Sequence, residues 1–156
     1  MGAAMIFRDA VEADLYAVVS LLADDVLGAE RETLTDPLPP DYMSAFHELT
    51  QQSGNRLIVA VDGEGAVCAC LQLTCIAGIA RKGAKRALIE GVRVRTDYRG
   101  TGLGTQIFEY AIAEAREAGC HLVQLTTDKT RPDAHRFYER LGFEASHIGM
   151  KYRIER

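Results

Sequence analysis

Residues 87–104 read ALIEGVRVRTDYRGTGLG, an apolar run followed, after a short polar connector, by three glycines at alternate positions. Because glycine has no Cβ atom, a backbone with closely spaced glycines can approach a bulky ligand, and phosphate groups are common ligands of such loops. Apolar side chains at helical spacing follow over residues 104–118 and end at Gly119. The stretch therefore predicts a strand, a phosphate-binding loop and a helix in direct succession.

Apolar segments on both sides extend this unit to a single α/β domain over residues 1–156. Short or alternating apolar runs bounded by turn residues predict strands at 5–9, 56–61, 66–76, 87–95, 121–127 and 143–154. Apolar residues at helical spacing predict helices at 12–27, 41–52, 104–118 and 131–141. The strands before the glycines are expected to pair antiparallel, and the unit around the glycines is expected to form a right-handed parallel crossover. In open sheets, ligands bind at the carboxyl ends of parallel strands, which is where the glycines lie.

The composition excludes several classes of protein. The net charge is −4 at pH 7 and the pI is about 5.6, which argues against nucleic-acid binding through bulk charge. The apolar stretches are too short to cross a membrane and the N-terminus lacks the apolar core of a signal peptide, so a soluble cytoplasmic protein is expected. The four cysteines lack the C-x-x-C spacing of a zinc site, so we expect reduced core residues and no metal.

Two well-known phosphate-binding motifs do not fit the glycines. A P-loop requires G-x-x-x-x-G-K-[ST], and the chain contains no Gly-Lys-Ser or Gly-Lys-Thr. A dinucleotide-binding G-x-G-x-x-G motif would need its last glycine where Thr105 or Ile107 stands. A tight turn into the helix that binds no ligand is the structural alternative.

The segment RGTGLG at 99–104 matches R/Q-x-x-G-x-G/A, the acyl-CoA-binding signature of the GNAT superfamily of N-acetyltransferases. Downstream, AHRFYERLGF at 134–143 resembles the A-x-x-F-Y-x-x-x-G-F motif of the same family, and the order of elements matches over the whole chain. The resemblance implies a mixed, mostly antiparallel sheet with a central parallel β-α-β crossover, in the order β-α-α-β-β-β-α-β-α-β. It also implies an acetyltransferase whose co-substrate is acetyl-CoA.

The resemblance assigns the donor site to the glycine loop and the strand before it. Backbone N–H groups of residues 100–105 would converge on the pyrophosphate of CoA, with the helix dipole behind them. Arg99 is expected to contact a phosphate or brace the loop, or else to be an ordinary surface arginine. The preceding strand would splay from the next one to hold pantetheine, and a backbone N–H near Val92 would polarise the thioester carbonyl. The expected acetyl-CoA-binding residues are Val92, Arg93, Val94, Arg99, Gly100, Thr101, Gly102, Leu103, Gly104 and Thr105.

Glu90 is one of two expected catalytic residues. Strict alternation would place it as the only charge on a face with Val92 and Val94, and a buried carboxylate with a raised pKa suits a general base. Family members often carry an acidic residue in this I-E-x-x-x-V context, where it acts through water on the acceptor amine. The alternatives are a bulge that turns Glu90 outward, or an ion pair with Arg93 or Arg86.

Tyr138 is the second expected catalytic residue. Helical spacing places it on the apolar side of the helix at 131–141, and family members use the matching tyrosine to protonate the departing thiolate. An ordinary tyrosine pKa of about 10 keeps the hydroxyl protonated, although a core tyrosine with a purely structural role is the alternative. One residue departs from the family pattern, because Arg131 stands where many members have an asparagine that contacts the cofactor.

The identity of the acceptor is the least constrained feature. Six acidic residues and one base lie from Asp24 to Asp41, which would suit a cationic acceptor, although a solvated acidic face is the alternative. The resemblance implies direct attack by a primary amine, on a small molecule or a peptide, in a ternary complex. It also implies a homodimer, whereas the net charge and the short apolar stretches argue against nucleic acid and a membrane as partners. A catalytically silent sensor that binds acyl-CoA is the alternative function.

Overall fold

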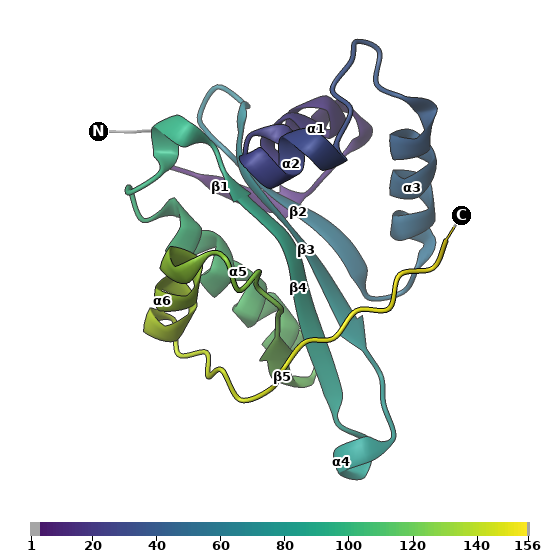
Figure 1. The fold of residues 1–156 in the computed structure, drawn as a ribbon, viewed down its shortest axis with the longest axis vertical. Coiled ribbons are helices and arrows are strands. Elements are labelled where there is room, and N and C mark those ends of the chain that lie inside the picture. Colours follow the sequence, from purple (N-terminus) through teal and green to yellow (C-terminus); the bar gives the residue numbers. More distant parts are fainter. Residues whose placement is uncertain (1–3, 156) are drawn as a thin grey trace.

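The computed structural model describes residues 4–155, which form a five-stranded sheet with helices on both faces (Figure 1). The strands are β1 (Ile6–Asp9), β2 (Asn55–Val61), β3 (Val67–Ile76), β4 (Lys85–Val94) and β5 (Cys120–Gln124). The helices are α1 (Leu15–Ala23), α2 (Val26–Arg31), α3 (Pro40–Gln51), α4 (Ala80–Gly83), α5 (Leu103–Glu117) and α6 (Pro132–Arg140), with 3₁₀ turns at Glu12–Asp14 and Thr96–Tyr98. The strands neighbour one another in chain order and pair antiparallel, except that β4 and β5 are parallel. The mixed sheet with a β4-α5-β5 crossover confirms the predicted fold class.

Alternation along the strands builds an apolar core on each face of the sheet. On one face, Ile89 and other strand residues pack under α5, whose Phe108 is fully buried. On the other face, α1 covers a smaller cluster made of Val18, Leu21, Val59, Val61, Val67 and Cys70. Cys68 and Cys70 are buried and all four cysteines are free thiols, as the sequence predicts, although the other two are only partly buried.

A β-bulge interrupts β4 in the middle of the decisive stretch. Cys70 of β3 pairs with Arg93, whereas Gln72 pairs with Glu90, so β4 has one residue more than β3 between these two pairs. Gly91 lies inside the bulge with φ of 61°, a left-handed conformation that glycine adopts without steric cost. The extra residue shifts the alternation of β4 by one position.

The bulge makes the predicted face of Glu90 wrong. Ile89, before the bulge, lies in the α5 cluster, and Val92 and Val94, after it, pack against that same cluster. Since neighbouring residues of a strand point to opposite faces, Glu90 lies on the face opposite to Val92 and Val94. Glu90 is exposed, so its carboxylate does not undergo the desolvation that strict alternation predicts.

The predicted helix at 12–27 is divided in the structure. A 3₁₀ turn at 12–14 leads into α1, and a second helix, α2, begins at Val26. Asp25 between them is extended and its carboxylate accepts a hydrogen bond from the backbone N–H of Gly28. Asp is a favoured N-cap residue, so Asp25 interrupts the predicted helix and begins a second one.

The predicted final strand at 143–154 is wrong, since no residue from 143 to 155 belongs to a strand. The sheet ends at β5, and the yellow C-terminal trace in Figure 1 is extended but lies outside the sheet. Its apolar residues alternate as in a strand, yet they are exposed because no described strand lies beside them. Period-two alternation indicates strand conformation, but a ladder also needs a partner edge.

Candidate active site

The two parallel strands of the crossover separate at their carboxyl ends. The last paired residues are Leu88 of β4 and Gln124 of β5, so residues 89–94 of β4 have no partner in β5. This half of β4 therefore borders a seam between the two strands, and it leads directly into the loop before α5. The seam coincides with the segment that the sequence assigns to pantetheine.

The glycine loop leaves the start of α5 uncovered. Gly100 and Gly102 have φ of 75° and 90°, and a Cβ atom added at either residue would meet no atom within 4 Å. Gly102 is the N-cap of α5, and no side chain caps the first backbone N–H groups of this 15-residue helix. Unpaired N–H groups and the positive end of the helix dipole favour an anion at this position. The geometry fits a phosphate group.

The remaining loop residues have structural contacts. A Cβ atom on Gly104 would lie 3.4 Å from Cζ of Phe137 and 3.7 Å from Cγ2 of Val94, which are ordinary van der Waals distances. The expectation that Gly104 keeps room for an anion stays a prediction. Leu103 is buried in the core, and the Thr101 hydroxyl donates a hydrogen bond to the backbone oxygen of the preceding turn.

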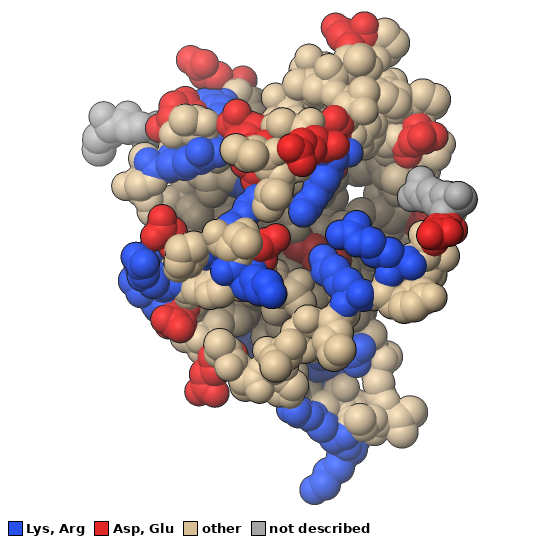
Figure 2. Space-filling model, viewed as in Figure 1, with Lys and Arg blue, Asp and Glu red and all other residues tan. Residues whose placement is uncertain are grey.

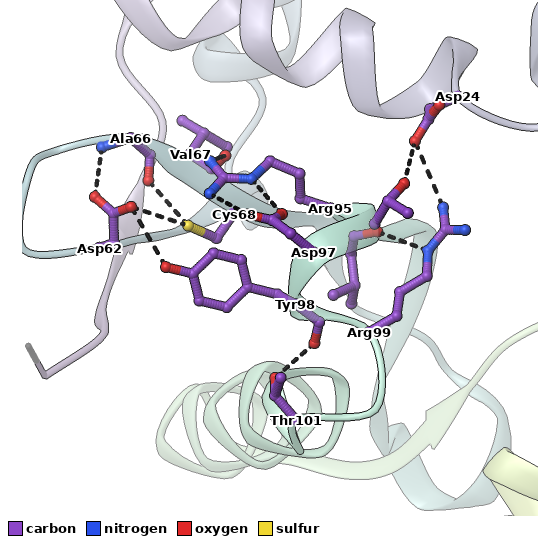
Figure 3. A network of polar contacts seen from close by, with 12 residues as sticks. Asp24, Asp62, Ala66, Val67, Cys68, Arg95, Asp97, Tyr98, Arg99 and Thr101 are labelled. Carbon is purple, nitrogen blue, oxygen red and sulfur yellow. Dashed lines mark hydrogen bonds and ion pairs between the residues drawn. The ribbon is translucent and has the colours of Figure 1, made fainter. Parts of the chain in front are cut away.

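Arg99 ties the loop to the rest of the domain (Figure 3). Its Nε donates a hydrogen bond of 3.2 Å to the backbone oxygen of Val94, and its Nη2 lies 3.6 Å from Oδ2 of Asp24. The hydroxyl of Thr96 donates to the same Asp24 oxygen at 2.9 Å. These contacts join the glycine loop to the end of α1. They support the loop-bracing role among the alternatives for Arg99.

Tyr138 lies on α6 within an aromatic cluster beside the seam. Its ring makes edge-to-face contacts, with centroid distances of 5.6, 5.6 and 6.1 Å, to Phe108, Phe137 and Phe143. Burial raises the pKa of the hydroxyl above its ordinary value, although the positive charges of Arg93 and Arg131 act in the opposite direction. The hydroxyl is therefore protonated at neutral pH. It can donate a proton to a departing anion.

Asp25 joins three parts of the chain at the same place. Its Oδ2 lies 2.7 Å from Nη2 of Arg131 and 3.5 Å from Nη2 of Arg93, and its other oxygen caps α2. Desolvation acts to raise the pKa of Asp25, but hydrogen bonds from Gly28 and Arg131 and the charges of both arginines hold it below its ordinary value. Sequence reasoning missed this residue, because Asp25 and Arg131 are 106 residues apart. Only its helix-capping pattern was visible.

Glu90 lies at the bulge, in the half of β4 that has no partner in β5. Among residues 4–155 it forms no ion pair, and Arg93 pairs with Asp25 instead. The neighbouring Gly91 faces Leu22 of α1, since a Cβ atom there would lie 3.8 Å from Cδ2 of that leucine. The interpretation in which a bulge turns Glu90 outward is therefore confirmed, and its carboxylate is accessible from the α1 side of the sheet.

No group of three or more His, Cys, Asp or Glu side chains within residues 4–155 is arranged to hold a metal ion. No helix in the same range is both long and apolar enough to cross a membrane.

Comparisons with known proteins agree with the predicted family. The model of the acetyltransferase (GNAT) family matches residues 23–143. L-methionine sulfoximine/L-methionine sulfone acetyltransferase of Pseudomonas aeruginosa is 28% identical over 151 residues, 93% of this chain and 86% of that protein. Aminoalkylphosphonate N-acetyltransferase of Salmonella typhimurium is 44% identical over 60 residues, 38% of this chain and 39% of that protein. The crystal structure of a transcriptional regulator from Bacillus halodurans is 50% identical with a TM-score of 0.93, covering 97% of this chain and 100% of that one.

Proposed function

Because the chain belongs to the GNAT acetyltransferase family, we propose that it transfers the acetyl group of acetyl-CoA to a primary amine by direct attack. The observation that carries the proposal is the seam between β4 and β5, with the uncapped start of α5 at one end. Tyr138, with its protonated hydroxyl, lies beside the same seam. This arrangement supports a donor site with Tyr138 as the acid.

The loop and β4 would hold the donor. The N–H groups at the start of α5 offer hydrogen bonds to a pyrophosphate, and Gly100 and Gly102 leave space for it. The unpaired backbone at Val92, Arg93 and Val94 would bind the pantetheine arm, in place of the missing β5 partner. A backbone N–H near Val92 would donate to the thioester carbonyl and stabilise the negative charge that develops on its oxygen.

The reaction requires one proton to leave the amine and one to reach the sulfur. Bound acetyl-CoA supplies an activated acyl group and a thiolate leaving group. Glu90 would act through a water molecule to take the proton that the attacking amine loses as its N–C bond forms. Tyr138 would donate its proton to the sulfur as the C–S bond breaks, and it would regain a proton from solvent. The products are the N-acetylated amine and CoA.

The acceptor is proposed to be an amine on a small molecule or a peptide. The names of two relatives, which acetylate an aminoalkylphosphonate and L-methionine sulfoximine, support an amine as the attacking group. The acidic segment lends less support to a cationic acceptor than the sequence suggests. Asp24 pairs with Arg99, and Asp25 pairs with Arg93 and Arg131.

A second candidate function is acyl-CoA sensing without catalysis. The 50% identity to a chain described as a transcriptional regulator favours it. The presence of Tyr138 and Glu90 at the seam favours the enzyme. A homodimer stays a prediction from the family resemblance, and a cytoplasmic location stays a prediction from the sequence.

An amine panel separates the two candidates. The protein is incubated with acetyl-CoA and each of a set of amino acids, aminoalkylphosphonates, polyamines, aminosugars and peptides, and the released thiol is measured. An enzyme releases CoA thiol with some amines and yields the N-acetylated product in equal amount by mass spectrometry. A sensor binds acetyl-CoA in calorimetry but releases no thiol with any amine, and this result would reject the proposed function.

A further inference from the structure

Two guanidinium groups share one carboxylate next to Tyr138. Arg93 lies in the half of β4 that has no partner in β5, and Arg131 is the residue before α6. Both side chains contact Oδ2 of Asp25. Their separations from this oxygen, 3.5 and 2.7 Å, show that Arg131 takes the closer contact. The three groups together carry a net positive charge. Figure 2 shows further basic side chains across the middle of the face that Figure 1 presents.

Arg93 also has unused hydrogen-bonding capacity. Its Nη1 donates to the backbone oxygen of Val92 at 2.9 Å, but its Nε is buried and has no acceptor among the described residues. Buried donors in native proteins nearly always have a partner, and a guanidinium satisfies its donors best with a planar acid group. The Nε has almost no accessible surface, so a ligand with acceptor oxygens would meet the exposed ends of the two guanidinium groups instead.

We propose that Arg93 and Arg131 bind an acidic group, a carboxylate or a phosphonate, on the acceptor amine. The inference rests on the proposed acetyl transfer, and it adds the chemical class of the acceptor. The acid group would accept from the exposed guanidinium N–H groups of Arg131 and Arg93, whose side chains are 35% and 20% exposed, while Asp25 holds both side chains in position. Its amine would then lie on the side of the seam where Tyr138 and the thioester are expected to meet.

The test compares matched acceptors and matched variants. Acetyl transfer is measured with α-amino acids and aminoalkylphosphonates and with their uncharged esters. The variants are Arg131→Gln, Arg131→Lys and Arg93→Gln, and Arg136→Gln on an exposed side of α6 is the control. Each variant is first shown to melt as a folded protein.

The wild type is expected to prefer the free acids over the esters. Arg131→Gln should lower kcat/KM for the acids by about 10- to 100-fold, since a hydrogen bond between charged groups contributes that much. It should leave kcat/KM for the esters and the KM of acetyl-CoA unchanged. Arg131→Lys should lose part of this effect, because it keeps the charge but not the fork of donors. Arg136→Gln should change nothing.

Three outcomes would overturn the inference. Equal activity on acids and esters would show that no acid group is recognised, although the proposed transfer would stand. A rise in the KM of acetyl-CoA in Arg93→Gln or Arg131→Gln, equal for all acceptors, would assign these arginines to the donor phosphates instead. A protein that acetylates no amine would reject the inference together with the function.

Discussion

Replacing Tyr138 by Phe removes one oxygen from the aromatic cluster beside the seam. No described group accepts a hydrogen bond from this hydroxyl, and the ring contacts to Phe108, Phe137 and Phe143 are kept. Since an intramolecular hydrogen bond contributes about 0.5–1.5 kcal/mol and none is lost here, the free energy of unfolding should change by less than about 1 kcal/mol. For a chain of this size, that corresponds to a shift in Tm of less than about 4 °C.

The effect of Tyr138→Phe on turnover should be much larger. General acid catalysis contributes about 10²- to 10⁴-fold, which corresponds to about 3–5 kcal/mol of transition-state stabilisation. The variant should therefore lose kcat by this factor and keep its affinity for acetyl-CoA. Because burial raises the pKa of Tyr138, the wild-type rate should fall only above pH about 10, and the variant should lack this fall.

The assay is thiol release with saturating acetyl-CoA and amine, followed as a function of pH. Tyr110→Phe serves as the control, since this tyrosine lies on α5 and stacks on Phe7 at 5.3 Å, away from the seam. It should retain wild-type turnover. A Tyr138→Phe variant that melts normally and retains most of the wild-type kcat would refute the role of the hydroxyl as the acid.

Three further substitutions test other parts of the site and the fold. Gly102→Ala places a Cβ at φ of 90°, so it should lower the free energy of unfolding by about 1–2 kcal/mol in chemical denaturation. The same substitution should weaken acetyl-CoA binding in calorimetry. Unchanged binding would contradict a phosphate at this loop. Glu90→Gln should lower kcat/KM by about 10²-fold. Its Tm should stay unchanged, because the side chain is exposed. Full activity would exclude Glu90 as the base. Asp14→Asn should lower the free energy of unfolding by about 1–3 kcal/mol at neutral pH, since the carboxylate accepts a 2.6 Å hydrogen bond from Arg8. That bond holds the pKa of Asp14 below its ordinary value. The higher free energy of unfolding of the wild type should therefore be present above pH about 3.9 and should vanish as the pH falls through the lowered pKa. A difference between the two proteins that does not depend on pH would contradict a contribution from the ionised carboxylate.

The sequence was most informative where structure depends on neighbouring residues. The alternate glycines before a helical pattern predicted the β4-α5-β5 unit, and the structure has it. The face of Glu90 was wrong because one extra residue, Gly91, reverses the alternation of β4, and this bulge depends on the register with β3. A single glycine in an apolar run did not reveal that pairing.

Long-range contacts were beyond reach from the sequence for a related reason. Asp25 and Arg131 lie 106 residues apart, and only the folded chain brings them together with Arg93. The division of the helix at 12–27 follows from the capping carboxylate of Asp25, which competes with helical continuity at that position. The alternation over residues 143–154 predicted a strand that the structure lacks, because a strand also needs a partner edge, which the segment itself does not encode.

Direct transfer from acetyl-CoA to an amine is tested most simply in a single turnover. The protein is mixed with acetyl-CoA, with and without an amine that the panel has identified, and the free thiol and the intact mass of the protein are followed. Direct attack predicts that CoA thiol appears only when the amine is present, in equal amount to the N-acetylated amine, while the mass of the protein never changes. Thiol release without amine, accompanied by an acetylated protein, would contradict the proposed mechanism.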